Sequence, residues 1–285
     1  MGFWVTIILM GLSFSSLLFI LASGFSLIFG LMNVLNLSHG AYYLIGSYVG
    51  LSIYGWTGNF LLAILAGAAV AGLIGIGMER GFVRYLPGQL LDQVLLTIGF
   101  LYIFTNLAQW IWGPVEQIPK APSLVAGSLQ IGDYFFPIYH FVVIFTGLVM
   151  AIGLWLFQEK TRFGAIIRAG TDNREMTMGL GINLRLVFSW VFCLGVLLAG
   201  VAGVIGLPLL GATLESGAEI LLYAVIVVIV GGLGSLQGAL AGSLLIGIIH
   251  TFGKVFFPPL AFFMIYLLVI VILLVRPSGL LGRAS

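Results

Sequence analysis

The stretch Gly24–Gly50 reads GFSLIFGLMNVLNLSHGAYYLIGSYVG, and it sets a small group of polar residues inside a long apolar region. The polar residues and the glycine that follows them are Asn33, Asn36, Ser38, His39 and Gly40. No Lys, Arg, Asp or Glu occurs in the first 78 residues. Polar groups are costly in lipid unless protein buries them or they line a water-filled path. The stretch therefore predicts a broken or re-entrant segment beside a translocation pathway.

The polar residues of this stretch have two interpretations each. The asparagines and the serine either contact a solute or satisfy the backbone of a helix break. His39 is either a pathway residue that senses pH or a hydrogen-bonded histidine of the core. Further along the chain, Asn106 and Gln109 lie three residues apart on one face of an apolar segment. They either line the pathway or form hydrogen bonds between helices.

The composition is that of a polytopic membrane protein. Of the 285 residues, 61% are hydrophobic and 7% are charged, and the mean hydropathy is +1.21. Soluble domains carry about 25% charged residues, so a water-soluble fold cannot hide this much apolar surface. The 40 glycines suit helices that approach one another closely in lipid. The net charge of +2 gives no indication of a nucleic-acid partner, and the single cysteine, Cys193, excludes an intrachain disulfide.

Hydropathy predicts an all-α fold with one transmembrane domain over residues 1–285. A bilayer core of about 30 Å requires about 20 apolar residues per helix, which predicts nine spans, with eight or ten as alternatives. The first span is expected to be interrupted, and the predicted discontinuity lies near residues 24–40. The predicted spans are 4–30, 39–56, 60–78, 93–112, 138–157, 187–209, 217–231, 237–253 and 259–275.

The basic residues predict the orientation. Nine of the 11 Lys and Arg residues fall on one side of this layout, in the loops 79–92 and 158–186 and in the tail from Arg276 to Arg283. Lys120 and Lys254 fall on the other side. Because cytoplasmic loops carry an excess of basic residues, we expect a cytoplasmic C-terminus and an N-terminus outside.

Two loops are long enough to have structure of their own. The outer loop, 113–137, is rich in proline and partly alternating, which predicts a small extracytoplasmic hairpin. The inner loop, 158–186, predicts two short helices on the membrane face that are available to a soluble partner. Thr171 and Asp172 are expected to cap the second helix, and Gly179 and Gly181 to end it.

Several chemistries have no signature in the sequence. The chain has no Walker A motif, since its one Gly-Lys pair, Gly253-Lys254, is followed by valine. The three histidines are isolated, so we expect no metal site and no metalloprotease. No carboxylate is predicted in the middle of a span, although proton-coupled pumps usually carry one. We therefore expect no enzymatic activity and no cofactor in this chain.

Four stretches in order resemble a known family. They are Gly24–Gly46, Arg168–Asn183 with the sequence RAGTDNREMTMGLGIN, Val230–Gly247 with VGGLGSLQGALAGSLLIG, and Arg276–Gly282 with RPSGLLG. The chain resembles the LivH-like permease subunit of bacterial ABC importers for branched-chain amino acids. The adjacent residues Glu79 and Arg80 also occupy the place where that family carries such a pair.

The resemblance implies a bacterial inner-membrane subunit that provides a translocation path by alternating access. It implies a second related permease, two cytoplasmic ATPases that bind ATP and Mg²⁺, and a periplasmic or lipid-anchored substrate-binding protein. The implied coupling residues lie in the loop 158–186: Arg168, Asp172, Arg174, Glu175, Gly179 and Gly181. Relatives also move urea, short amides and aromatic acids. An ion-coupled secondary transporter and a passive channel are the alternatives.

Overall fold

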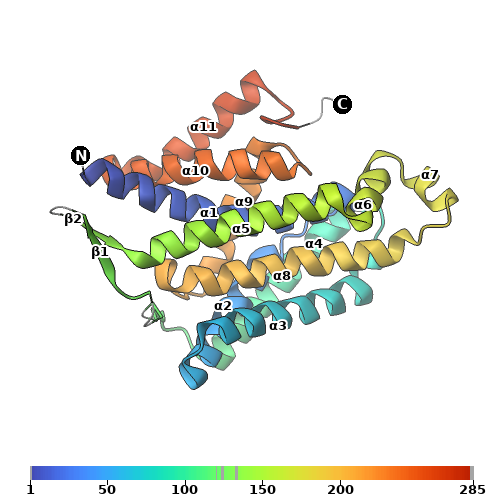
Figure 1. The fold of residues 1–285 in the computed structure, drawn as a ribbon. Coiled ribbons are helices and arrows are strands. Elements are labelled where there is room, and N and C mark those ends of the chain that lie inside the picture. The colour runs from blue at the N-terminus through green and yellow to red at the C-terminus, as the bar shows by residue number, and fades with distance from the viewer. Residues whose placement is uncertain (1, 120, 123–124, 132–133, 283–285) are drawn as a thin grey trace.

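The structure is a helical bundle with one small β-hairpin, and two of its helices form the centre (Figure 1). The computed structural model describes residues 2–119, 121–122, 125–131 and 134–282. The central helices are α1 (Gly2–Met32) and α8 (Leu184–Leu210), and most of their side chains are buried. Helix α1 packs against α10 (Leu236–Phe256), α8 and α5 (Ile138–Lys160), while α8 also packs against α2 (His39–Thr57) and α3 (Phe60–Gly81).

The remaining elements surround this centre. The mostly exposed helices are α4 (Leu90–Trp112) and α11 (Ala261–Val275), and α9 (Ser216–Gly231) lies between α2 and α10. The strands β1 (Ser128–Ile131) and β2 (Tyr134–Pro137) pair antiparallel, which confirms the predicted hairpin. The short helices are α6 (Arg162–Asp172), α7 (Arg174–Gly179) and the 3-10 turns η1 (Val83–Tyr85) and η2 (Pro258–Leu260).

Each predicted span coincides with a helix in the described part of the chain. Seven of these helices are long and apolar enough to cross a membrane, and the exceptions are α2 and α9. Helix α9 has only 16 residues, and α2 carries tyrosines, serines and glycines. Both are largely buried by other helices, so neither has to present an apolar surface to lipid over its whole length. The number of spans stays a prediction.

The interruption expected within residues 4–30 does not occur, because α1 is continuous from Gly2 to Met32. Serines do not break the helix, and two of them donate their hydroxyls to carbonyls of the same helix. Ser15 Oγ lies 2.8 Å from Gly11 O, and Ser23 Oγ lies 2.8 Å from Ile20 O. The discontinuity near residues 24–40 is instead the non-helical segment 33–38 between α1 and α2.

The two short helices expected in the loop 158–186 are confirmed as α6 and α7, but the expected cap is wrong. Thr171 and Asp172 lie in the last turn of α6. Asn173 caps α7, because its Oδ1 accepts a hydrogen bond of 2.9 Å from Met176 N. An extended residue between the two helices is a better cap than one that is still helical. Gly181, with a φ of 79°, follows α7.

The two ends of the bundle differ (Figure 1). One end, the hairpin end, carries the N-terminus and the strands, and the other, the α6–α7 end, carries the two short helices. At the α6–α7 end the chain beyond α11 folds back onto the turn between α9 and α10. Leu280 N donates to Val230 O at 2.8 Å, and Leu281 N donates to Gly231 O at 2.9 Å. Lys120 and Arg283, which entered the orientation argument, lie outside the described residues.

Candidate translocation site and coupling surface

The break between α1 and α2 begins at Asn33. This residue has a φ of 52°, the left-handed conformation that asparagine tolerates better than most residues. Its N–H donates to Phe29 O at 2.8 Å, so Asn33 ends α1 in the manner of a glycine at a helix C-terminus. The side chain is exposed.

Asn36 and Ser38 hold the break through a short local network. Asn36 is fully buried, and its Oδ1 accepts from Ser38 N at 3.2 Å and from Ser38 Oγ at 2.5 Å. This is an Asx-turn, in which an asparagine side chain takes the place of a backbone acceptor. The Nδ2 of Asn36 has no hydrogen-bond partner among the described residues. In this conformation the Asn36 side chain satisfies the backbone N–H of Ser38, which is one of the two interpretations of the sequence, while the Ser38 hydroxyl bonds to the side chains of Asn36 and Met78.

A threonine on α4 clamps the same segment. Leu37 N donates to Thr97 Oγ1 at 3.2 Å, and Thr97 Oγ1 lies 3.4 Å from Leu35 O. Thr97 is fully buried. Sequence reasoning missed it because a threonine within an apolar helix usually bonds to its own backbone, and nothing local in α4 marks a contact sixty residues away.

His39 begins α2 and lies inside the interface with α1. It is fully buried, with Nε2 3.1 Å from Leu21 O and its ring edge-on to Phe25 at 5.6 Å between centroids. In the described part of the chain its Nδ1 has no hydrogen-bond partner. This placement fits the interpretation of a hydrogen-bonded core histidine.

Gly40 allows the backbones of α2 and α9 to touch. A Cβ at this position would overlap Gly217 O and would lie 2.7 Å from Leu221 Cβ. The polar break and the start of α2 are therefore held by contacts with three helices: α1 through His39, α4 through Leu37 and α9 through Gly40.

Asn106 and Gln109 are both exposed on α4, so they do not join the buried group around Asn36 within this chain. Asn106 Nδ2 donates to Tyr102 O of its own helix at 2.7 Å.

A pocket of about 850 Å³ opens at the α6–α7 end. It lies between the end of α1, α6, the turn before α10 and the chain beyond α11. Asn33 lines this pocket together with Arg168 and Arg174, so the structure brings one predicted pathway residue and two predicted coupling residues to the same place. Gln237 and Ser278 add neutral polar groups to its wall.

The two arginines tie the short helices to the bundle. Arg168 donates through Nη1 to Gln158 O, and the same nitrogen lies 3.6 Å from Glu159 Oε2 at the end of α5. The guanidinium of Arg174 lies 4.7 Å from the centroid of the Phe188 ring on α8, a cation–π contact. A displacement of α6 would therefore change its contact with α5, and a displacement of α7 would change its contact with α8.

Helix α7 and Leu180, the residue after it, present side chains that the bundle does not cover. Met176 is 70% exposed and Leu180 is 76% exposed, and Met178 and Glu175 are exposed as well. Thr177 faces inward. Gly179 ends α7, and Gly181 supplies the positive φ that leads to α8. An apolar patch in a segment outside the long helices is typical of a contact surface for another protein.

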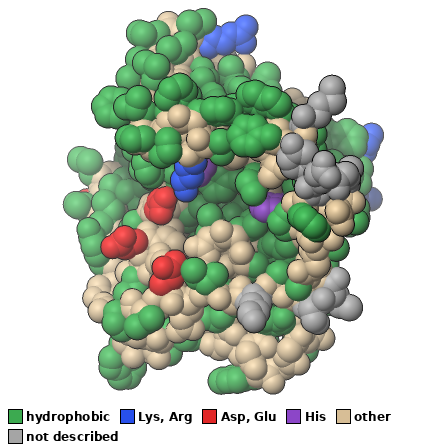
Figure 2. All heavy atoms as spheres, turned by 90° about the vertical axis from the view of Figure 1, so that its left-hand side faces the viewer, with side chains coloured by type: hydrophobic (Ala, Val, Ile, Leu, Met, Phe, Trp, Pro, Cys, Tyr) green, Lys and Arg blue, Asp and Glu red, His purple; other side chains and the backbone are tan. Residues whose placement is uncertain are grey.

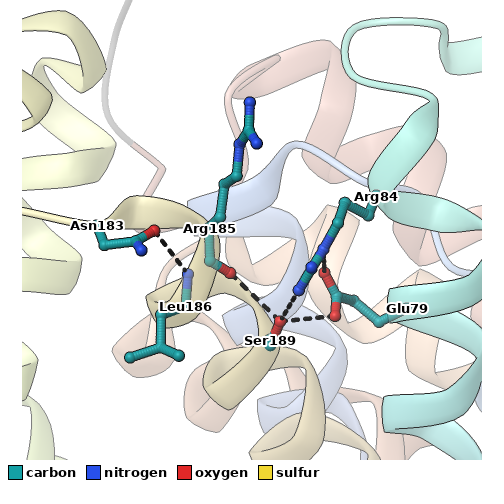
Figure 3. A network of polar contacts seen from close by, with 6 residues as sticks. All are labelled: Glu79, Arg84, Asn183, Arg185, Leu186 and Ser189. Atoms are coloured by element: carbon teal, nitrogen blue, oxygen red, sulfur yellow. Dashed lines mark hydrogen bonds and ion pairs between the residues drawn. The ribbon is translucent and has the colours of Figure 1, made fainter.

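A charged network joins α3 to α8 (Figure 3). Glu79, only 2% exposed, accepts a hydrogen bond of 2.7 Å from Ser189 Oγ and lies 3.5 Å from Arg84 Nε. Arg84 Nη2 donates to Ser189 Oγ at 2.8 Å. Glu79 therefore pairs with Arg84, in η1, and not with its neighbour Arg80, which is exposed. The contact with Arg84 depends on the turn after α3, which hydropathy does not reveal.

The network predicts that removing the charge of Arg84 destabilises the protein more than removing the charge of Glu79. Arg84→Met should lower the free energy of unfolding by about 3 kcal/mol, because it leaves a buried carboxylate with one hydroxyl partner. Glu79→Gln should cost only about 1 kcal/mol, since the amide keeps a hydrogen bond and the Arg84 side chain, 35% exposed, can reach solvent. Thermal unfolding of the purified protein in detergent measures both effects, with Arg80→Met as the control. An equal or larger loss in Glu79→Gln would contradict the prediction.

Comparison with known proteins gives a consistent picture. A family model described as the permease component of the branched-chain amino acid transport system matches residues 7–274. The chain is 32% identical to the high-affinity branched-chain amino acid transport system permease protein BraD of Pseudomonas aeruginosa, over 96% of this chain and 94% of that protein.

Two LivH proteins are also similar. The probable branched-chain amino acid transport permease protein LivH of Methanocaldococcus jannaschii is 30% identical, over 94% of this chain and 90% of its own length. The LivH permease protein of Escherichia coli K12 is 28% identical, over 96% and 94%. The family model's match spans the polar break, the α6–α7 segment and helices α9 and α10, and the comparisons confirm the resemblance to this family. A polytopic helical bundle with this match over most of its length belongs to the branched-chain amino acid transport permease family.

Proposed function

We propose that this chain is the permease subunit of an ATP-driven ABC importer for branched-chain amino acids or a related small amphipathic solute. The family match over residues 7–274 carries the proposal. The structure supports it through the exposed apolar face of α7, which gives a cytoplasmic ATPase a surface to contact. Two ATPase subunits would bind and hydrolyse ATP with Mg²⁺, and a second related permease and a periplasmic or lipid-anchored binding protein would complete the transporter.

The charge distribution supports a cytoplasmic α6–α7 end in a bacterial inner membrane. The described arginines lie in η1, α6, α7, the start of α8, the end of α3 and the residue after α11, all at that end of the bundle (Figure 1). Lys254 is the basic residue of the described chain near the hairpin end. By the positive-inside rule the hairpin end and the N-terminus are then outside.

The geometry suggests how a partner's movement would reach the pathway. ATPase motion at α7 would pass through Arg174 to α8 and through Arg168 to α5. Both arginines also line the pocket that Asn33 borders, so this movement would change the space beside the polar break. The conformation of that break would be set by Asn36, Ser38, His39 and Gly40. Alternating access would follow if the break adopted one conformation in the inward-open state and another in the outward-open state.

Asn106 and Gln109 fit the pathway only at a contact with a second subunit. Exposed amides on a membrane helix are unfavourable against lipid. A second permease packed on this face of α4 would cover them, and a path between the two permeases would then pass these side chains.

Uptake by reconstituted vesicles tests the proposal. Vesicles that contain the permease, its sister permease and the ATPases should accumulate radiolabelled leucine only when ATP and the binding protein are present. Uptake by this chain alone under a Na⁺ or proton gradient would favour the secondary transporter instead. Downhill flux without ATP or binding protein would favour a passive channel.

A further inference from the structure

Two helices meet at the hairpin end with matching pairs of polar residues. On α9, Glu219 lies four residues before Tyr223, and on α10, Lys254 lies four residues after His250. A spacing of four puts each pair on one helix face. The helices are antiparallel neighbours, and the Tyr223 and His250 rings are 5.2 Å apart between centroids. Glu219 and Lys254 therefore lie one turn outward from a tyrosine–histidine contact.

The inner pair is buried and lacks partners. Tyr223 is 3% exposed and His250 is 5% exposed, yet neither Tyr223 OH nor His250 Nε2 has a hydrogen-bond partner within the part of the chain that the structure describes. A buried polar atom without a partner costs about 1–3 kcal/mol. Such atoms are usually paired in folded proteins, and here two of them belong to rings that contact each other directly below a pair of charged residues.

The outer pair is charged, exposed and unengaged. Among the described residues, neither Glu219 nor Lys254 has an ion pair or a side-chain hydrogen bond. The hairpin end is hollowed, and acidic, basic and histidine side chains gather around the hollow (Figure 2). Opposite charges that flank a hollow without neutralising each other suit a ligand that carries both charges.

Aromatic rings supply the apolar wall. Phe14 of α1 stacks on His250 at 4.4 Å between centroids, and Phe262 of α11 stacks on Tyr223 at 6.3 Å. Phe262 is 46% exposed and belongs to a helix that packs mainly on α10. Phe262 therefore lies between the tyrosine ring and the outer surface of α11.

We propose that Glu219, Tyr223, His250 and Lys254 form a binding site for a zwitterionic α-amino acid with an apolar side chain. Lys254 faces the carboxylate and Glu219 the ammonium group. Tyr223 OH and His250 Nε2 complete the hydrogen bonds, and the side chain lies against Phe14 and Phe262. The inference deepens the proposed function, on which it rests, because it gives the permease itself a part in recognising the solute that a binding protein delivers.

Ligand analogues separate the two charges. The full chain in lipid nanodiscs is titrated with L-leucine, with leucinamide, which lacks the carboxylate, and with 4-methylpentanoate, which lacks the amine. Lys254→Gln should weaken leucine binding about tenfold and leave leucinamide binding unchanged. Glu219→Gln should weaken leucine binding about tenfold and leave 4-methylpentanoate binding unchanged. Tyr223→Phe, which keeps the ring, should weaken leucine binding severalfold.

The control is Glu215→Gln, an exposed carboxylate in the turn before α9 that should leave all three affinities unchanged. Absent leucine binding by the unaltered chain, or equal affinities in all four variants, would overturn the inference. So would variants that weaken only the association of the binding protein, because this face would then be a protein-docking surface. ATP-driven uptake by the assembled transporter tests the proposed function separately, and it can persist when the inference fails.

Discussion

Gly40→Val should prevent the protein from folding, and Gly40→Ala should cost about 3 kcal/mol of stability. An added Cβ would overlap Gly217 O and would crowd Leu221 Cβ. Extra atoms in a packed core cost about 1–3 kcal/mol when side chains can adjust. Here the obstacle is a backbone carbonyl in α9, so relief requires two helices to separate. Such a loss is large against a total stability of about 5–15 kcal/mol.

Size-exclusion chromatography of the detergent-solubilised protein and its midpoint of thermal unfolding measure this effect. The matched control is Gly77→Ala in α3, where an added Cβ would meet nothing within 4 Å. We expect the control to elute and melt like the unaltered protein. A Gly40→Ala variant with an unchanged midpoint would show that α2 and α9 do not depend on this contact.

Glu175→Arg and Met176→Asp should each reduce ATPase association and ATP-driven uptake at least about tenfold, while the protein still inserts and folds. Both side chains are exposed on α7, so their replacement disturbs no packing within the chain. A few central side chains usually supply most of the energy of a protein interface, at 2 kcal/mol or more each. Met176→Asp places a charge in the apolar patch, and Glu175→Arg reverses a charge beside it. Each change should remove one such contribution to the binding energy.

Co-purification of the ATPase subunits and stimulated ATP turnover test these variants. Glu116→Arg is the control, because it makes the same charge reversal on an exposed residue near the hairpin end. Unchanged co-purification together with unchanged turnover in the α7 variants would exclude α7 from the contact.

Hydropathy was sufficient to predict the positions of the long helices, but it did not predict which groups the polar side chains bond to. Apolar runs placed all the long helices because burial in lipid depends on composition over about 20 residues. The polar residues of α1 did not interrupt it, since a serine hydroxyl can bond to its own helix. The break came at Asn33, where the backbone is left-handed, and no local pattern separates that asparagine from Asn36.

The sequence indicated several residues of the candidate site, but it missed Thr97 and predicted none of the contacts between distant segments. The polar stretch and the loop 158–186 were visible as exceptions to a uniform apolar chain. The clamp by Thr97, the pairing of Glu79 with Arg84 and the shared pocket of Asn33 and Arg168 all join distant segments. Such contacts depend on how the helices pack, and the local sequence pattern around each residue does not predict them.

The burial of α2 has a consequence for biogenesis. A ribosome delivers α2 long before α8 and α9, the helices that cover it, since α8 begins more than a hundred residues further along the chain. Until they arrive, its tyrosines and serines face lipid, the insertion machinery or the neighbouring α1 and α3. We therefore expect a late step in which α8 and α9 cover the part of α2 that α3 and α4 leave open. A truncation before α8 should leave α2 poorly inserted and prone to degradation.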